Sequence, residues 1–363
     1  MATAPTAPTA PTDLAPIRHK GLTYPFGDAE PAPGGTMRVA PGIAWVRLTV
    51  PGPLKHVNCW VLDDADSRGE GVALVDTGMN TADARDAWKA VFKGPLAGTR
   101  VTKMVGTHFH PDHIGLAGWM CDRHDAPLVM TRGEWLTARM LLGDASETVP
   151  EAQIAFWRGG GWDDAQVAHA SMQGWALFRL VTRPLPLGYT RIADGDTLTI
   201  GARDWRVVVG SGHSPEHACL YDAEAGVLIG GDQVLPRISP NVSLGATEPN
   251  ADPLGEWFAS IAKLKTLPDN LLVLPGHGAP FTGLRARLDA MDREHRERLD
   301  ELEAFLTEPR RAVDCFGRLF RRAIGPEMLG MATGESLAHL RRLEVEGRAV
   351  RDTVDGVWWW RAT

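Results

Sequence analysis

One short stretch of the chain, Thr107-His108-Phe109-His110-Pro111-Asp112-His113, constrains what the chain can be more than any other. Its imidazoles and carboxylate are donors that suit zinc and similar divalent ions. The apolar run at 101–106 predicts a strand before it, and a helix is expected to begin near Asp112. A chance cluster of solvated histidines does not account for an ordered run at a strand end. The stretch therefore predicts a metal site with the donors His108, His110, Asp112 and His113.

Composition indicates a globular protein. With 363 residues, of which 44% are hydrophobic, the chain is long enough for about two domains with a packed core. The formal net charge of −7 argues against a surface that coats nucleic acid uniformly, although it leaves room for a local basic patch. The cysteines lie far apart beside apolar residues, and we expect reduced, mostly buried thiols. They are Cys59, Cys121, Cys219 and Cys315.

The N-terminus, residues 1–20, begins with repeated Ala-Pro-Thr and is predicted to be disordered, because it cannot bury enough apolar surface. It has neither the basic start nor the apolar run of a secretory signal. No stretch approaches the ~18 consecutive apolar residues that a membrane helix needs. We therefore expect a cytoplasmic protein without a membrane partner.

Strand and helix patterns alternate along the chain, which is typical of an α/β fold. A helix over 81–91 begins at the N-capping residue Thr81. Strands are predicted at 43–50, 57–63, 72–76, 101–106, 127–130 and 271–274, a second β-rich section at 197–229, and further helices at 253–267 and 284–306.

The region from about 133 to 185 is predicted to be a helical insertion rich in Trp, Phe and Met. These side chains either face an apolar substrate, as in a lid, or pack against the body or a partner subunit. Packing is the commoner use of such a pattern, so no binding residue is assigned there.

The tail, residues 309–363, has a pattern of its own. A helix at 335–346 precedes two short strands joined across Asp355-Gly356, which is a hairpin signal, and the whole resembles a small winged-helix domain. Ten arginines against seven acidic residues give it a formal charge of +3. Such a surface can bind nucleic acid. The tryptophans at 358–360 cannot all face one side of a strand, however, so part of the run should be buried, and docking or dimerisation is the alternative role.

Three later stretches carry further metal donors, each near the end of a β-rich segment: His213 in 212–217, Asp232 in 230–232 and His277 in 275–278. With the first stretch and Val75-Asp76-Thr77-Gly78 they resemble, in order and spacing, the five motifs of the metallo-β-lactamase superfamily. The resemblance covers residues 43–306. It implies an αββα sandwich with the site at one edge, here expected as a catalytic domain over 21–308, with the helical insertion and the small C-terminal domain added.

The resemblance also implies the ligands. One metal ion would be held by His108, His110 and His213. A second ion would be held by Asp112, His113 and His277, with Asp232 bridging both. Asp76 would orient the ligand loops, and His217 is expected to support the ligands rather than join them. Zinc is the expected metal because His110 stands where diiron flavoproteins of the superfamily carry Glu, while iron and manganese stay open.

Two ions ~3.5–4 Å apart can share a hydroxide and stabilise both oxygens of a displacement. The sequence therefore predicts a binuclear metal-dependent hydrolase, in which Asp112 also assists proton transfer. The Cys-Gly-His-Glu pattern of glyoxalase II relatives is missing around His277. Cytosolic relatives with Gly-His-Gly at this position and a winged-helix-like tail are the nearer resemblance, and they include both thioesterases and ribonucleases.

Two substrate classes stay open. The first prediction is a small thioester or ester, acyl-CoA-like or a lactone, because the insertion is apolar and the body acidic. The alternative is single-stranded RNA, cut by an endoribonuclease or phosphodiesterase, because the tail is basic. A metal-stabilised binding module without activity is disfavoured by the intact ligand set, and a homodimer is left open.

Overall fold

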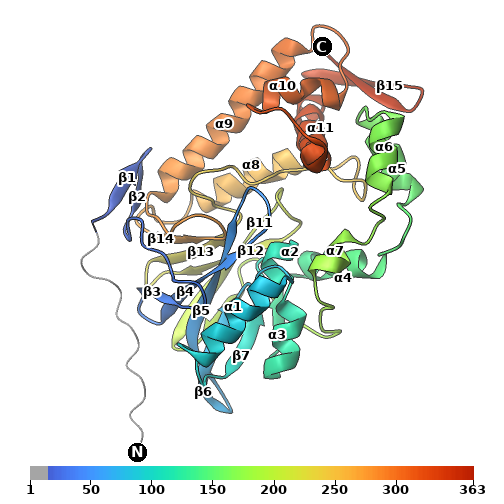
Figure 1. The fold of residues 1–363 in the computed structure, drawn as a ribbon. Helices are drawn as coiled ribbons and strands as arrows, with labels where there is room; N and C mark the ends of the chain where they lie inside the picture. The colour runs from blue at the N-terminus through green and yellow to red at the C-terminus, as the bar shows by residue number, and fades with distance from the viewer. Residues whose placement is uncertain (1–14) are drawn as a thin grey trace, which may run out of the picture.

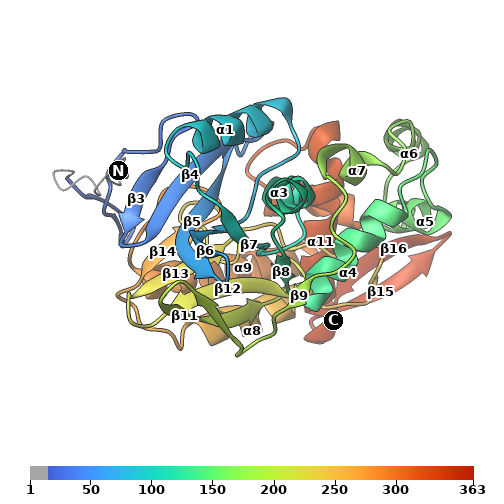
Figure 2. The ribbon, with the colours of Figure 1, turned by 90° about the horizontal axis from the view of Figure 1, so that it is seen from below.

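The computed structural model describes residues 15–363. Two large β-sheets stack face to face, and helices cover the outer face of each, which gives four layers in the order α, β, β, α (Figures 1 and 2). The predicted αββα sandwich is confirmed.

The first sheet has seven strands in the order β3-β4-β5-β6-β7-β8-β9. Neighbours are antiparallel up to β6, and the strands from β6 to β9 run parallel. The strands are β3 (Met37–Ala40), β4 (Ile43–Thr49), β5 (His56–Asp66), β6 (Gly69–Val75), β7 (Val101–Val105), β8 (Leu128–Met130) and β9 (Thr190–Arg191).

The second sheet has five strands in the order β10 to β14. Only its last pair, β13 and β14, is parallel. The strands are β10 (Thr197–Ile200), β11 (Arg203–Gly210), β12 (His217–Asp222), β13 (Val227–Gly231) and β14 (Leu272–Pro275).

Side-chain alternation along β5 explains how one strand serves two cores. Val57, Cys59 and Val61 face the helices that cover the first sheet, whereas Trp60 and Leu62 face the second sheet. Successive side chains of a strand point to opposite faces. A strand buried on both sides therefore reads as a continuous apolar run, as residues 59–62 do.

The outer layers are formed by α1 (Ala82–Lys93) and α3 (Ala117–His124) on the first sheet and by α8 (Pro253–Leu264) and α9 (Leu284–Phe305) on the second. Thr81 caps α1 as predicted, because its side chain accepts a hydrogen bond from the backbone of Ala84. Between β7 and α3 lies the short α2 (Pro111–Ile114).

The insertion is helical, as predicted, and lies to one side of the sandwich (Figure 1). Several of its large apolar side chains remain exposed, among them Met172 and Leu180. Its helices are α4 (Arg132–Gly143), α5 (Glu151–Gly159), α6 (Asp164–Ser171) and α7 (Leu177–Val181).

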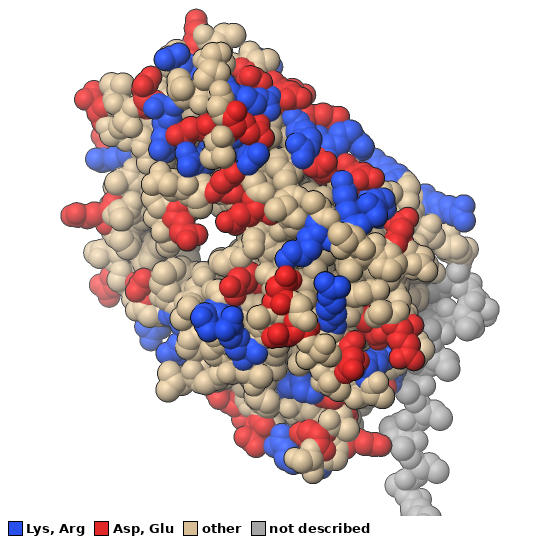
Figure 3. Space-filling view, turned by 180° about the vertical axis from the view of Figure 1, so that it is seen from behind, with Lys and Arg blue, Asp and Glu red and all other residues tan. Residues whose placement is uncertain are grey.

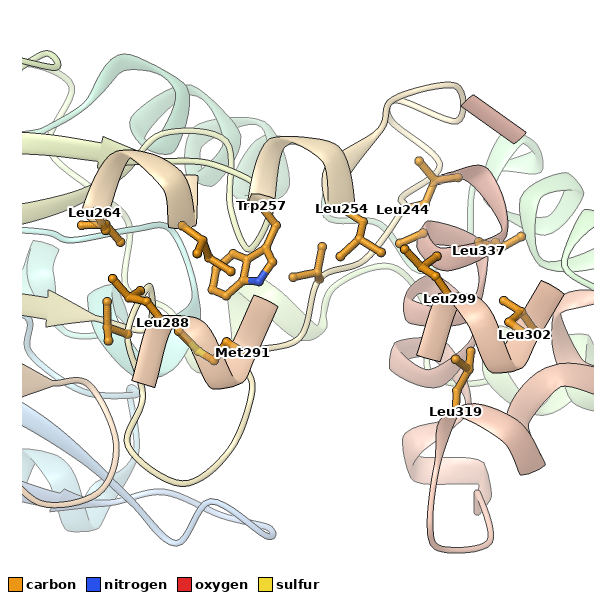
Figure 4. Packing of buried hydrophobic residues seen from close by; sticks show 14 of the residues in the cluster. Leu244, Leu254, Trp257, Leu264, Leu288, Met291, Leu299, Leu302, Leu319 and Leu337 are labelled. Atoms are coloured by element: carbon orange, nitrogen blue, oxygen red, sulfur yellow. The ribbon is translucent and has the colours of Figure 1, made fainter. Parts of the chain in front are cut away.

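The tail forms a helix, α11 (Leu329–Val345), followed by the expected hairpin of β15 (Ala349–Val354) and β16 (Val357–Ala362). Shorter helical segments precede them: η1 (Ala312–Cys315), α10 (Phe316–Leu319) and η2 (Pro326–Met328). Leu337 of α11 packs in one continuous cluster with Leu299 of α9 and with the α8 side chains (Figure 4). The tail therefore shares a core with the second sheet's outer layer, and the domain boundary at 308/309 stays a prediction.

One N-terminal prediction is corrected. Within residues 15–20, expected to be disordered, β1 (Ile17–His19) pairs with β2 (Leu22–Tyr24), and Thr23 pairs with Thr282. The hairpin forms because the β2 side chains Leu22 and Tyr24 are buried in the core beside α9. The rest of that predicted segment, residues 1–14, lies outside the described residues. All four cysteines are free and buried, as predicted. Among the described residues no helix is long and apolar enough to cross a membrane.

Candidate metal centre

The seven predicted donors meet at one edge of the sandwich. They follow the carboxyl ends of β7, β13 and β14, and precede β12 in the case of His213. Parallel neighbours end at the same edge of a sheet, and ligand sites of α/β sheets lie there. The structure therefore brings together residues that lie up to 169 positions apart, although which of them bind metal stays a prediction.

Three imidazoles form the first group of donors, His108, His110 and His213. The Nε2 atom of His108 lies 3.0 Å from Nδ1 of His110 and 3.3 Å from Nε2 of His213. A tetrahedral zinc ion with zinc–nitrogen distances of about 2.0–2.1 Å needs ligand nitrogens roughly 3.3 Å apart. The spacing of these nitrogen atoms fits one shared cation.

Asp112, His113 and His277 form a second group. The Asp112 carboxylate lies 3.2 Å from Nε2 of His277. Asp232 stands between the two groups: its oxygens lie 3.3 Å from His113, 3.4 Å from His277 and 3.8 Å from His213. This is the place that a carboxylate bridging two ions would occupy.

Buried atoms in the centre also lack ordinary partners. The Nε2 atoms of His113 and His277 and one oxygen of Asp232 are buried without a hydrogen bond among the described residues. Buried polar atoms are seldom left unsatisfied. Divalent cations would satisfy them, so the donor set fits two metal ions.

In several of the donor imidazoles, Nδ1, the ring nitrogen that points away from the centre, makes a hydrogen bond. His113 Nδ1 donates to Asp76 (2.7 Å), His277 Nδ1 to the backbone oxygen of His56 (2.6 Å), and His213 Nδ1 to the backbone oxygen of Asn241 (2.7 Å). Such partners fix the tautomer and the ring orientation of a ligand. In each case Nε2 is left to point into the centre.

Asp76 has the orienting role that the sequence predicts. Its backbone φ of 62° is unusual for a residue other than glycine. Besides His113, the carboxylate accepts hydrogen bonds from the backbone and the hydroxyl of Thr107, both at 2.8 Å. Asp76 thereby ties the end of β6 to the loop that carries His108 to His113.

Two glycines leave room for the donors. A Cβ atom on Gly276 would lie 2.1 Å from an oxygen of Asp232, and one on Gly231 would lie 2.6 Å from the ring of His217. Both distances are far below contact. Any larger residue at these positions would push the Asp232 carboxylate or the His217 ring out of place.

Burial and charge set the protonation of the donors. Burial lowers the pKa of His108 well below its ordinary value, and it brings the pKa of His110 to about 3. For Asp112 burial acts upward, but the charges of His113 and His277 bring its pKa to about 2. Burial also acts downward on His113 and His277, but the charge of Asp232 raises their pKa values, well above the ordinary value for His113 and to about 10 for His277. Imidazoles bind metals in the neutral form, so a metal ion would have to displace a proton from these two rings.

His217 lies behind the ligands, in agreement with the supporting role expected for it. It is buried, its ring stacks on that of His108 at 4.7 Å, and its Nε2 accepts a hydrogen bond from the backbone of Asp232 (3.1 Å). Its ring therefore braces two donors at once.

Glu134, in the first turn of α4, is a site residue that the sequence analysis did not find. Its side chain is fully buried and accepts hydrogen bonds from the backbone of Phe109 (2.8 Å), the hydroxyl of Ser214 (2.6 Å) and the backbone of Glu216 (2.7 Å). It joins the two loops that carry the first group of donors. Burial raises the pKa of Glu134 to about 7, against the effect of these hydrogen bonds.

A second supporting contact that the sequence analysis did not find comes from the tail. The Asn241 side chain donates to Glu335 of α11 (3.0 Å), and the same asparagine accepts from His213 through its backbone. Helix α11 therefore helps to place a metal donor. No signal in the sequence marks Glu134, Asn241 or Glu335, because each is an ordinary polar residue in a helix or loop.

Comparison with known proteins agrees with the geometry. The family model of the metallo-beta-lactamase superfamily matches residues 52–277, and that of the metallo-beta-lactamase-like C-terminal domain matches residues 299–363. A crystal structure of a beta-lactamase domain protein from Burkholderia ambifaria is 37% identical, with a TM-score of 0.87 over 94% of this chain and 98% of that one. The metallo-beta-lactamase family protein TTHA1429 from Thermus thermophilus is 29% identical, with a TM-score of 0.76 over 90% and 100% of the two chains.

Two curated relatives are more distant. The probable metallo-hydrolase YqjP of Bacillus subtilis is 26% identical over 77% of this chain and 86% of its own length. The acyl-coenzyme A thioesterase MBLAC2 of Gallus gallus is 27% identical over 65% of this chain and 77% of its own length. Together with the donor geometry, these matches show that the chain belongs to the metallo-beta-lactamase superfamily and carries its C-terminal domain.

Proposed function

We propose that the protein is a zinc-dependent hydrolase of thioesters or esters. The observation that carries the proposal is the pair of donor groups that share Asp232. Two divalent ions held there would supply a nucleophile at neutral pH and polarise a substrate carbonyl. Imidazole nitrogens dominate the donor set, which favours zinc over magnesium or calcium.

Asp112 is proposed to move the proton. Its side chain is more exposed than that of Asp232, at 14% against 9%. Against the effect of burial, the charges of His113 and His277 lower the pKa of Asp112 to about 2, so its carboxylate is ionised at neutral pH, although so low a pKa makes it a weak base.

The apolar insertion supports an acyl substrate. Phe109, between two metal donors, packs against Phe178 of α7 with ring centroids 6.3 Å apart, so apolar surface of the insertion begins next to the metal centre. The distant thioesterase relative points to the same substrate class.

The tail gives less support to RNA than its composition suggests. Most of its arginines are engaged by carboxylates of the chain, and on the face shown in Figure 3 basic and acidic groups intermix. Trp360 is buried, and Trp358 packs against Phe156. The paired arginines are Arg310, Arg311, Arg341, Arg342, Arg348, Arg351 and Arg361.

The test is a substrate panel on protein stripped by chelation and reloaded with zinc, manganese or iron. The panel holds acyl-CoA thioesters, nitrophenyl esters, lactones and single-stranded RNA. We expect zinc-dependent thioester or ester hydrolysis, which Asp232→Asn abolishes and Asp204→Asn, an exposed position on β11, leaves intact. RNA cleavage without ester turnover, or full activity after chelation, would refute the proposal.

A further inference from the structure

The helical insertion contains an apolar recess that the metal centre does not use. Its cavity volume is about 180 Å³, and its lining is predominantly apolar. It lies between side chains of all four insertion helices. We call it the insertion recess, and its apolar walls are Leu141, Trp157, Ala170, Trp175, Leu177 and Phe178.

One wall of the recess reaches the metal centre. The ring of Phe178 packs against Phe109, and the ring of Phe109 lies 4.5 Å from that of the donor His110. Only one aromatic ring therefore separates the recess wall from a metal donor. Figure 1 shows α7 beside α2, and Figure 3 shows, from behind, an opening between the insertion and the sandwich.

Apolar surface continues outward from the recess. Met172, Leu177 and Leu180 are 77%, 54% and 67% exposed. A concentration of exposed large apolar side chains marks a surface that meets a partner protein, a membrane or an apolar ligand. Packing against the body, one of the two packing roles considered for this region, does not account for these three exposed side chains. The other packing role is contact with a partner subunit.

We propose that the insertion recess binds the acyl chain of the substrate and selects chains of medium length. The proposal rests on the proposed function, because the metal centre would hold the thioester carbonyl while the chain passes Phe109 and Phe178. A cavity of about 150 Å³ holds one benzene ring. A volume of about 180 Å³ then suits a terminal segment of roughly six to eight carbons.

Two substitutions of opposite effect test the recess. Ala170→Leu fills it and should move the preferred acyl-CoA toward shorter chains, whereas Leu141→Ala enlarges it and should move the preference toward longer chains. Each methylene of the acyl chain for which the recess gains or loses room should change kcat/KM about fourfold. Turnover of acetyl-CoA, which does not reach the recess, should stay at the wild-type level.

The matched control is Ala168→Leu, which adds the same atoms to an exposed position of α6. It should keep the wild-type chain-length profile from acetyl to dodecanoyl. If neither Ala170→Leu nor Leu141→Ala moves the profile, or if both move it in the same direction, the recess is not the acyl site. Leu141→Ala keeps the test valid if Ala170→Leu does not fold.

Binding of octanoate separates this inference from the proposed function. Trp157 and Trp175 line the recess, so octanoate should quench tryptophan fluorescence of the whole protein, and Ala170→Leu should weaken its binding about tenfold or more. If no thioester is hydrolysed with any metal, the proposed function is wrong. Octanoate binding to the wild type and to Ala170→Leu then still tests whether the recess takes an acyl chain. Equal binding to wild type and Ala170→Leu, or no binding to either, overturns the recess assignment.

Discussion

The metal centre and the insertion are built in opposite ways. In the centre, His108 and His113 are fully buried, and several donor rings are fixed by a second hydrogen bond behind them. In the insertion, Met172 and Leu180 lie exposed, and apolar contacts surround a recess. Hydrogen bonds hold the side chains of the first region in place, whereas the second provides mainly shape and apolar surface. Under the two proposals above, chemistry and selectivity would be carried by separate parts of the chain.

Glu134 is where the two regions meet. It belongs to the first insertion helix, yet its carboxylate binds both loops that carry His108, His110 and His213. The insertion therefore has a second use besides its recess. Substitutions in the two regions should differ in kind, and this difference can be measured.

The largest effect is expected at the carboxylate shared by both donor groups. Asp232→Asn removes a charge that lies within 3.8 Å of three imidazoles. Hydrolysis should fall by more than about 100-fold, because the contribution of bound metal amounts to several kcal/mol. Metal content measured by inductively coupled plasma mass spectrometry should drop with it. Two retained metal ions with full activity would contradict the bridging role.

A smaller effect is expected at the support provided by the insertion. In Glu134→Gln only one side-chain oxygen remains to accept hydrogen bonds, so the contact with one of the two ligand loops is lost. Metal affinity should therefore weaken by about 10- to 100-fold. Competition with a chelator measures the affinity. Glu151→Gln, an exposed glutamate of α5, is the control. Unchanged affinity in Glu134→Gln would mean that the ligand loops hold their positions without the insertion.

Glu134 should also make stability depend on pH. Its pKa rises from 4.5 to about 7 on folding because of burial, so the unfolded state loses this proton first as pH increases. Stability should therefore fall between about pH 4.5 and 7, by up to about 3 kcal/mol. The free energy of unfolding is measured with denaturant for metal-free wild type and Glu134→Gln at pH 5 and pH 8. The effect of Glu134 is the change with pH in the difference between the two proteins. A difference that does not change with pH would show that Glu134 keeps an ordinary pKa.

The link from the tail should have a milder effect on the same donors. Glu335→Ala removes the carboxylate that accepts a hydrogen bond from the Asn241 side chain. The backbone oxygen of Asn241 in turn orients the ring of His213. We expect metal affinity to fall about 10-fold, at the low end for a supporting residue. Glu327→Ala, which alters an exposed residue of η2, should have no effect. If both variants bind metal like wild type, α11 does not contribute to the centre.

The smallest effect is expected for exposed apolar side chains of the insertion. Met172→Ala should change the free energy of unfolding by less than about 0.5 kcal/mol. Met120→Ala, at a fully buried position of α3, should cost about 2–5 kcal/mol. Thermal and denaturant unfolding of the pair measure the contrast. Comparable losses would show that Met172 is packed in solution, and the insertion would then resemble the core.

Much of the fold could be predicted from local patterns. The strands at 43–50, 57–63 and 101–106 appear as β4, β5 and β7, because apolar runs bounded by turn residues specify strands locally. The hairpin across Asp355-Gly356 forms for the same reason. The pairing of residues 17–24 was missed, because that hairpin depends on burial of Leu22 and Tyr24 against distant α9.

The sequence by itself marked His108, His110, Asp112 and His113 as predicted metal donors, because four donor side chains fall within six residues at a strand end. The resemblance to the superfamily added His213, Asp232 and His277 to that prediction. Only the tertiary structure decided what surrounds them. Glu134 reaches Ser214 across 80 positions of the chain, and Arg342 of the tail pairs with Asp252 across 90. Such contacts form when packed elements bring distant side chains together, and no local pattern encodes them. For that reason the donor candidates and the supporting roles of Asp76 and His217 could be predicted from the sequence. The contacts of Glu134, Asn241 and Glu335, the pairing of the tail arginines and the insertion recess could not.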